Sequence, residues 1–168
     1  MLGQMAEPVT LPEKIDPESL PEKEWALTGA TDRERNLVLA APLTDDALVE
    51  LNEHLQERYQ TITENEQRWE TAHLDGAELV IVAYGSAARI SLAAIERARE
   101  DGIPVGMIRP VSLWPFPERA FREAEDVTQY LVVEMNNGQM VTDVELAVRH
   151  DVPVRHHGKG GGWRPSPE

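Results

Sequence analysis

Hydrophobic and polar positions divide the chain into a mainly polar first half and a second half with strong apolar runs. The longest run, Leu79 to Tyr84, lies between an Asp-Gly pair and a Gly-Ser pair. A continuous run of this length between turn residues is typical of a strand buried on both faces of a parallel sheet. Helical spacing follows over residues 87–100, and a second apolar run covers residues 103–109. This strand–helix–strand order predicts two parallel strands joined by a crossover helix.

The alternation of strands and helices continues to about residue 155. Pro110 stops the second strand, and the Trp-Pro-Phe-Pro sequence of residues 114–117 predicts a rigid apolar turn. After it we predict a helix over 118–125, a strand over 130–135, a helix over 139–148 and a short edge strand over 152–155. The whole pattern predicts an α/β fold with an open, mostly parallel sheet in a three-layer arrangement.

Residues 44–72 carry a different pattern. Thr44 and the two aspartates after it form a good helix start, and apolar residues then recur at spacings of three, four and seven as far as Trp69. We predict an amphipathic helix that ends near Thr71. Its narrow apolar stripe has two interpretations, because the helix could cover its own domain or pack against a helix of a partner chain.

The first 43 residues have the composition of an extended segment. Four prolines stand among Glu and Lys within residues 1–30, without an apolar period. We predict a strap across a neighbouring surface, anchored by Trp25 and Leu27, since a linker seldom leaves a tryptophan exposed. The predicted regions are a strap and linker over 1–43, a helix over 44–72, an α/β domain over 75–155 and a Gly-rich tail over 156–168.

Composition narrows the class of protein. The chain has 168 residues, 41% hydrophobic and 27% charged, which suits one soluble domain with an appendage. The longest apolar run is far too short to span a bilayer, so we expect a cytoplasmic protein. There is no cysteine, which excludes disulfides, iron–sulfur ligation and a cysteine nucleophile within this chain. The formal net charge of −14 argues against nucleic-acid binding, which depends on Lys and Arg.

Candidate chemistry gathers at the carboxyl ends of the predicted strands. Gly85 and Ser86 end one strand and open a helix, which suits either anion binding or a simple turn with an N-cap serine. Arg89, Arg109 and Glu134 are expected at the same edge, as an ion-pair network or as groups that orient a partner. We predict that Arg109 and Glu134 meet directly or through one neighbour, as the ends of adjacent parallel strands would allow.

Two further segments are candidates for interfaces. The loop Asn136-Asn137-Gly138-Gln139 could expose amides to another subunit or form a tight turn, and both can hold together. Trp114 and Phe116 stand between prolines, so they lose little entropy on burial, either in this domain's own core or in a partner's surface.

Several motifs carry no assignment. His156 and His157 have no third ligand at metal-binding spacing, so we predict no metal site. The glycines around Lys159 do not form a phosphate-binding loop, because no Ser or Thr follows the lysine. No Ser–His–Asp order or paired carboxylates stand out, and no catalytic residue is assigned.

Taken together, several of these strings resemble the α subunits of 2-oxoacid:ferredoxin oxidoreductases. They are Val-Ala-Tyr-Gly-Ser at 82–86, Gly-Met-Ile-Arg-Pro at 106–110, Leu-Trp-Pro-Phe-Pro at 113–117 and Glu-Met-Asn-Asn-Gly-Gln-Met at 134–140. The resemblance runs from about Asp75 to the tail, and the preceding helix shares it. It implies a transketolase C-terminal-like domain, which serves as a scaffold and interface element.

The resemblance also implies a reaction and a set of partners. Such enzymes convert a 2-oxoacid, coenzyme A and oxidised ferredoxin to acyl-CoA, CO2 and reduced ferredoxin, with thiamine diphosphate held between α and β subunits. Residues 1–5 resemble an internal stretch near the end of the pyrimidine-binding domain, whose activating glutamate has no counterpart here. We therefore expect thiamine diphosphate, Mg²⁺ and iron–sulfur clusters elsewhere in an oligomeric complex with the β subunit and the remainder of α, and no activity from this chain alone.

Two other functions stay open. The chain could be a stand-alone interaction or regulatory module, or the scaffold domain of another thiamine enzyme; the motif from Glu134 to Gln139 favours the ferredoxin-linked family over the latter. Ferredoxin itself is not expected to dock here, because 30 Asp and Glu against 16 Lys and Arg would repel an acidic partner.

Overall fold

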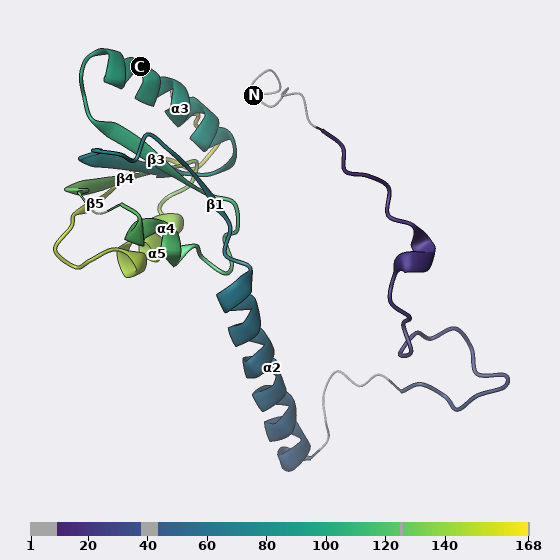
Figure 1. Ribbon diagram of the computed structural model, residues 1–168. Helices are drawn as coiled ribbons and strands as arrows, with labels where there is room; N and C mark the ends of the chain where they lie inside the picture. The colour runs from purple at the N-terminus through teal and green to yellow at the C-terminus, as the bar shows by residue number, and fades with distance from the viewer. Residues whose placement is uncertain (1–9, 38–43, 125, 168) are drawn as a thin grey trace. The chain divides into compact units, whose positions relative to one another are not determined.

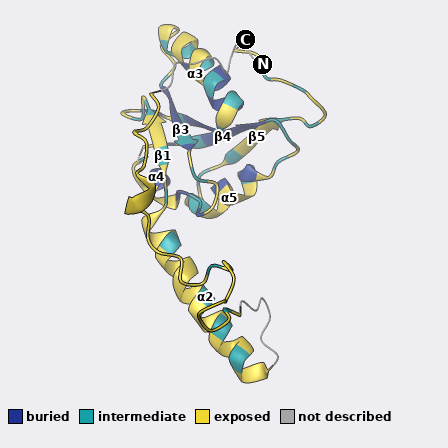
Figure 2. Cartoon of the chain, turned by 90° about the vertical axis from the view of Figure 1, so that its right-hand side faces the viewer, coloured by how far each residue is buried: buried dark blue, intermediate teal, exposed yellow. Residues whose placement is uncertain are grey.

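The computed structural model describes residues 10–37, 44–124 and 126–167. Two compact units divide the chain, one built on Glu7–Arg58 and the other on Tyr59–Glu168, with the boundary inside helix α2 (Asp45–Asn65). The first unit contains the 3-10 helix η1 (Pro17–Ser19) and most of α2, and none of its described residues is buried (Figures 1 and 2). No helix in the described ranges is both long and apolar enough to cross a membrane.

The second unit is built on a five-stranded mixed sheet with the strand order β1-β3-β2-β4-β5. Its strands are β1 (Trp69–Ala72), β2 (Leu79–Ala83), β3 (Val105–Pro110), β4 (Gln129–Glu134) and β5 (Val154–Gly158). The last four are parallel, and β1 runs antiparallel to β3.

Helices cover both faces of this sheet. Helix α3 (Gly85–Glu100) lies on one face, and the short helices α4 (Glu118–Arg122) and α5 (Met140–Ala147) lie on the other (Figure 1). This arrangement confirms the predicted open, mostly parallel, three-layer α/β fold. Each crossover returns the chain to the same end of the sheet, as a parallel sheet requires.

The core follows from the alternation of side chains along the central strand. Val80 and Val82 of β2 pack with the residues of α4 and α5, whereas Ile81 and Ala83 pack with those of α3. Successive side chains of a strand point to opposite faces, so a strand between two helix layers must be apolar at every position. The continuous apolar run in the sequence has this physical cause.

The helix predicted over 44–72 is shorter in the structure. It ends at Asn65, and the last four predicted residues form β1, where Trp69 lies opposite Pro110 in the register of the pair. The main-chain N–H groups of Val111 and Ser112 also donate to the carbonyl of Arg68. Pairing with a distant strand thus overrides the helical spacing, and the sheet begins before Asp75.

The tail also begins later than predicted. Strand β5 was expected to end at Arg155 but continues to Gly158, which lies opposite Glu134 of β4. Beyond the strand, the rings of His157 and Trp163 meet edge to face at 5.2 Å between centroids. A side chain at Gly158 would collide with the carbonyl oxygen of Glu134, so the glycine permits this close pairing.

Candidate functional site

The candidate site is a crevice at the carboxyl ends of β2 and β4. After β2 the chain passes through α3 to β3 on one side, and it then crosses to β4 on the other side of β2. Open α/β sheets bind ligands at such a reversal of strand order. A pocket of about 200 Å³ lies there, lined by Tyr84, Gly85, Ser86, Ala87, Glu134, Met135 and Asn136.

One wall of the crevice is the start of α3. Gly85 has a φ of +56°, which glycine adopts without steric cost, and Tyr84 occupies the N-cap position without a side-chain cap hydrogen bond. Ser86 therefore lies inside the helix, and the N-cap serine considered from the sequence is wrong. Arg89 lies one turn further along α3 and is partly buried. The first turn of this helix presents its positive dipole end to the crevice.

The opposite wall is built around Glu134, the last residue of β4, which is 1% exposed. Its carboxylate accepts hydrogen bonds from the main-chain N–H groups at the start of α5: Gln139 at 3.3 Å, Met140 at 3.0 Å and Val141 at 3.2 Å. A carboxylate at this end of a helix satisfies unpaired donors and complements the dipole. Glu134 thus ties the end of β4 to the start of α5.

The loop between β4 and α5 is a hydrogen-bonded turn. The Asn136 side chain accepts hydrogen bonds from the N–H groups of Gly138 at 2.8 Å and Gln139 at 3.2 Å. Gly138 has a φ of +98°, and the Asn137 side chain accepts a hydrogen bond from the N–H of Gly160 at 3.1 Å. These contacts hold the loop in one conformation. A contact between this loop and another subunit stays a prediction.

The predicted contact between Arg109 and Glu134 is wrong. Arg109 instead donates from Nη1 to Oε2 of Glu70 at 3.0 Å, its partner in the register of β1 and β3. Strand β2 stands between β3 and β4, so the two strand ends are not adjacent. The side chains of Ile108 and Val132 both face α4 and α5. Arg109 is one residue after Ile108 and therefore faces the other side of the sheet, whereas Glu134 is two residues after Val132 and faces the same side as Val132. Alternation therefore sends the two side chains to opposite faces of the sheet.

The two aromatic candidates for docking separate in the structure. Phe116 is partly buried and stacks on Phe121 of α4, with 5.8 Å between ring centroids. Trp114 is 60% exposed and meets Tyr59 edge to face at 5.7 Å. Phe116 therefore belongs to this unit's own core, and only Trp114 remains as a candidate for contact with a partner.

Among the residues that the structure describes, no group of three or more His, Asp or Glu side chains converges as metal ligands. The buried carboxylate of Glu134 is already occupied by three main-chain donors.

The sequence did not predict the structural partners of two candidate residues, Glu134 and Arg109. His156 lies with Nε2 3.5 Å from Oε1 of Glu134, and Glu70 is the partner of Arg109. His156 was considered only as a metal ligand. No local signal placed Glu70 on a strand, because Trp69-Glu70-Thr71-Ala72 runs apolar, polar, polar, apolar rather than alternating with a period of two.

A comparison with models of protein families identifies the family of this chain. The family model described as "Pyruvate:ferredoxin oxidoreductase core domain II" matches residues 77–168, more than half of the chain. The chain belongs to this family. The match covers β2 to β5 and all of the crevice, and it confirms the resemblance drawn from the sequence motifs.

Curated relatives extend the match beyond the α/β unit. The ketoisovalerate oxidoreductase subunit VorB of Methanothermobacter marburgensis is 44% identical over 148 residues, which are 88% of this chain and 42% of that subunit. The 2-oxoglutarate synthase subunit KorA of Methanocaldococcus jannaschii is 34% identical over 144 residues, or 84% of this chain and 37% of that subunit. The chain thus spans about two fifths of the length of these relatives.

A solved structure has the same fold. It is the 2-oxoglutarate:ferredoxin oxidoreductase from Magnetococcus marinus with 2-oxoglutarate, coenzyme A and succinyl-CoA bound. The likeness has a TM-score of 0.60 at 21% identity and covers 89% of this chain and 26% of that chain. At this identity the comparison supports the architecture and not the position of any ligand.

Proposed function

We propose that this chain is the C-terminal, scaffold and interface part of the α subunit of a thiamine diphosphate-dependent 2-oxoacid:ferredoxin oxidoreductase in the cytoplasm. The observation that carries the proposal is the family match over residues 77–168, which contain β2 to β5 of the sheet. The geometry of the crevice supports a structural role, because Glu134 is engaged in capping α5 and the loop from Asn136 to Gln139 is fixed by its own hydrogen bonds.

In the proposed reaction the 2-oxoacid loses its carboxylate as CO2 and its acyl group is transferred to the sulfur of coenzyme A. The thiol proton is released, and two electrons pass to ferredoxin, the oxidant. The described residues of this chain would touch none of the reacting atoms. Their role would be to assemble with the β subunit and with the remainder of α, which would hold thiamine diphosphate, Mg²⁺ and the iron–sulfur clusters.

The same proposal gives the sequence-predicted residues a role at an interface. Gly85 and Ser86 would offer main-chain donors at the mouth of the crevice, and Trp114 would offer an exposed aromatic anchor. Exposed aromatics that become buried on assembly contribute much of the binding energy of an interface. Replacing Trp114 with Ala should weaken assembly, while the matched replacement of Leu146, which is 79% exposed on α5, should not.

Reconstitution tests the function directly. The chain is purified alone and together with the β subunit and the remainder of α, and each sample is assayed for coenzyme A-dependent dye reduction. Ketoisovalerate and 2-oxoglutarate are the substrates, because they stand in the relatives' names. We expect no turnover from the chain alone and turnover from the assembled sample with one of the two acids.

Calorimetry separates a scaffold from a catalytic chain. We expect the chain alone to show no micromolar affinity for thiamine diphosphate with Mg²⁺. Micromolar binding, or dye reduction by this chain alone, would overturn the scaffold role. Stable association with the β subunit without any gain of turnover would instead favour a regulatory module. Crosslinks from ferredoxin into residues 75–155 would contradict the expected absence of ferredoxin docking on this acidic surface.

A further inference from the structure

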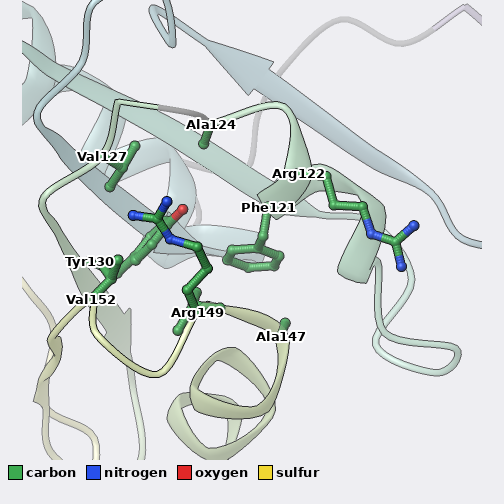
Figure 3. Close-up of a pocket in the computed structure, with 9 residues that line it drawn as sticks. Phe121, Arg122, Ala124, Val127, Tyr130, Ala147, Arg149 and Val152 are labelled. Atoms are coloured by element: carbon green, nitrogen blue, oxygen red, sulfur yellow. The ribbon is translucent and has the colours of Figure 1, made fainter.

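A second pocket lies at the opposite edge of the sheet from Glu134. It has a volume of about 410 Å³ and lies between α4 and α5, beside Tyr130 near the start of β4 (Figure 3). This volume is within the range of pockets that hold small organic molecules. The family resemblance and the comparisons assign no role to this place.

Apolar side chains form the walls of the pocket. Phe121 and Val127 are 7% and 5% exposed and belong to the core cluster, and Phe121 lies against the ring of Tyr130 with 5.5 Å between centroids. Ala124 and Ala147 also line the pocket, and their short side chains leave room beside these rings. A ligand with an apolar body could thus exclude water from a surface that is continuous with the core.

One polar group is held at the inner wall. Tyr130 is 3% exposed, and no hydrogen bond joins its hydroxyl to any residue that the structure describes. Among the described residues, every fully enclosed polar side-chain atom has a partner, so this hydroxyl must retain access to the pocket. A buried phenol usually finds a hydrogen-bond partner, and here a ligand or water in the pocket can provide it.

A guanidinium lies beside that hydroxyl. Figure 3 shows the side chain of Arg149 turned toward Tyr130, whereas the side chain of Arg122 points away from the pocket. Burial raises the pKa of the Tyr130 phenol, and the nearby charge of Arg149 acts in the lowering direction. Arg149 also faces Asp151, with 3.5 Å between Nε and Oδ1, in a pair of exposed side chains. Such pairs between exposed side chains contribute little, and Arg149 also lines the pocket.

We propose that this pocket binds a small organic monoanion, a carboxylate attached to an apolar group about the size of a phenyl ring. The guanidinium of Arg149 and the hydroxyl of Tyr130 would hold the carboxylate, and the apolar group would lie between Phe121, Val127 and Val152. One cation and one neutral donor suit a single negative charge. The inference does not rest on the proposed function.

The test is a titration of the full chain with 3-phenylpropionate, followed by amide chemical shifts and calorimetry. The matched neutral ligand is 3-phenylpropanamide, which has the same body without the charge. For a ligand of this size we expect a Kd of about 1 mM for the acid, and at least about tenfold weaker binding for the amide. Shift changes should centre on residues 121–124 and 147–152.

Three variants locate the binding groups. Tyr130→Phe keeps the ring packing and should weaken the acid about fivefold, and Arg149→Gln should weaken it about tenfold. Arg155→Gln, an exposed arginine on β5, is the matched control and should leave the Kd unchanged. Circular dichroism of each variant shows whether the fold is intact.

Four results would overturn the proposal. They are no shift changes up to about 20 mM of the acid, equal binding of the acid and the amide, equal losses in Arg149→Gln and Arg155→Gln, and preferential binding of phenyl phosphate. The last result would mean that the site selects a dianion rather than a carboxylate. Loss of binding in Tyr130→Phe with an unchanged circular dichroism spectrum supports the assignment of the hydroxyl.

Discussion

The two units of this chain differ in how far their apolar residues are buried. In the unit built on Tyr59–Glu168, Ile108 and its partner Val82 in the register of β2 and β3 are fully buried. In the described part of the unit built on Glu7–Arg58 no residue is buried, and Trp25 and Leu27 are 66% and 73% exposed. Both units contain patterned apolar residues. Only in the unit with the sheet do helices of the same unit cover the apolar residues that the structure describes.

This difference shows that an apolar pattern in the sequence predicts which residues favour burial. It does not predict which surface covers them. None of the residues of the α2 stripe is buried, although Leu51 and Leu55 are half-buried, and the anchors of the strap are exposed. Packing of these residues on a neighbouring surface stays a prediction. It would follow the rule that contiguous exposed apolar residues mark interaction sites.

The largest expected effect comes from a matched pair of substitutions in the two units. Ile108→Ala removes a fully buried side chain from between two layers and should lower the free energy of unfolding by about 2–5 kcal/mol. Leu51→Ala in α2 should change it by less than about 0.5 kcal/mol, because no residue of that helix is buried. Urea unfolding followed by circular dichroism measures both. Similar losses would mean that α2 contributes to the same core.

The second effect concerns the cap at the crevice. Glu134→Ala leaves three main-chain N–H groups, one buried and two partly buried, without their acceptor and should cost about 2–4 kcal/mol. Glu134→Gln keeps one oxygen as an acceptor and should cost less. The same unfolding experiment compares them, and exchange of the amide hydrogens of Met140 and Val141 should speed up most in the Ala variant. Unchanged exchange would contradict the capping role.

A smaller effect is confined to alkaline pH. Because burial raises the pKa of Tyr130, the folded state ionises this phenol less readily than the unfolded state does. Its contribution is therefore fully present below the unfolded pKa of about 10 and is lost as the pH rises through the folded pKa. Tyr130→Phe should flatten this alkaline loss of stability. An identical pH profile in both proteins would show that Tyr130 does not cause it.

The smallest effect is expected from the ion pair that replaced the predicted one. Arg109 and Glu70 have 38% and 61% exposed side chains, so water screens their attraction. A double-mutant cycle with Arg109→Gln and Glu70→Gln should give a coupling of about 0.5 kcal/mol or less that decreases with added salt. A cycle with Arg109→Gln and Glu134→Gln should give none, and coupling there would restore the original prediction.

The sequence by itself determined most of the α/β fold. The run from Leu79 to Tyr84 had to be buried on both faces, and the turns and helical spacing after it determined the parallel order. Motifs such as Glu-Met-Asn-Asn-Gly-Gln-Met at 134–140 were sufficient for the family. These features are local, because a period of two or 3.6 residues and a turn glycine depend only on neighbouring positions.

Only the tertiary structure decided what the individual side chains contact. The order of strands placed β2 between Arg109 and Glu134, and alternation along the strands sent their side chains to opposite faces. Pairing with β3 turned the end of a predicted helix into β1. Phe116 entered the core while Trp114 remained outside. Each outcome depends on a contact between residues far apart in the chain, and no local period of the sequence encodes the partner of such a contact.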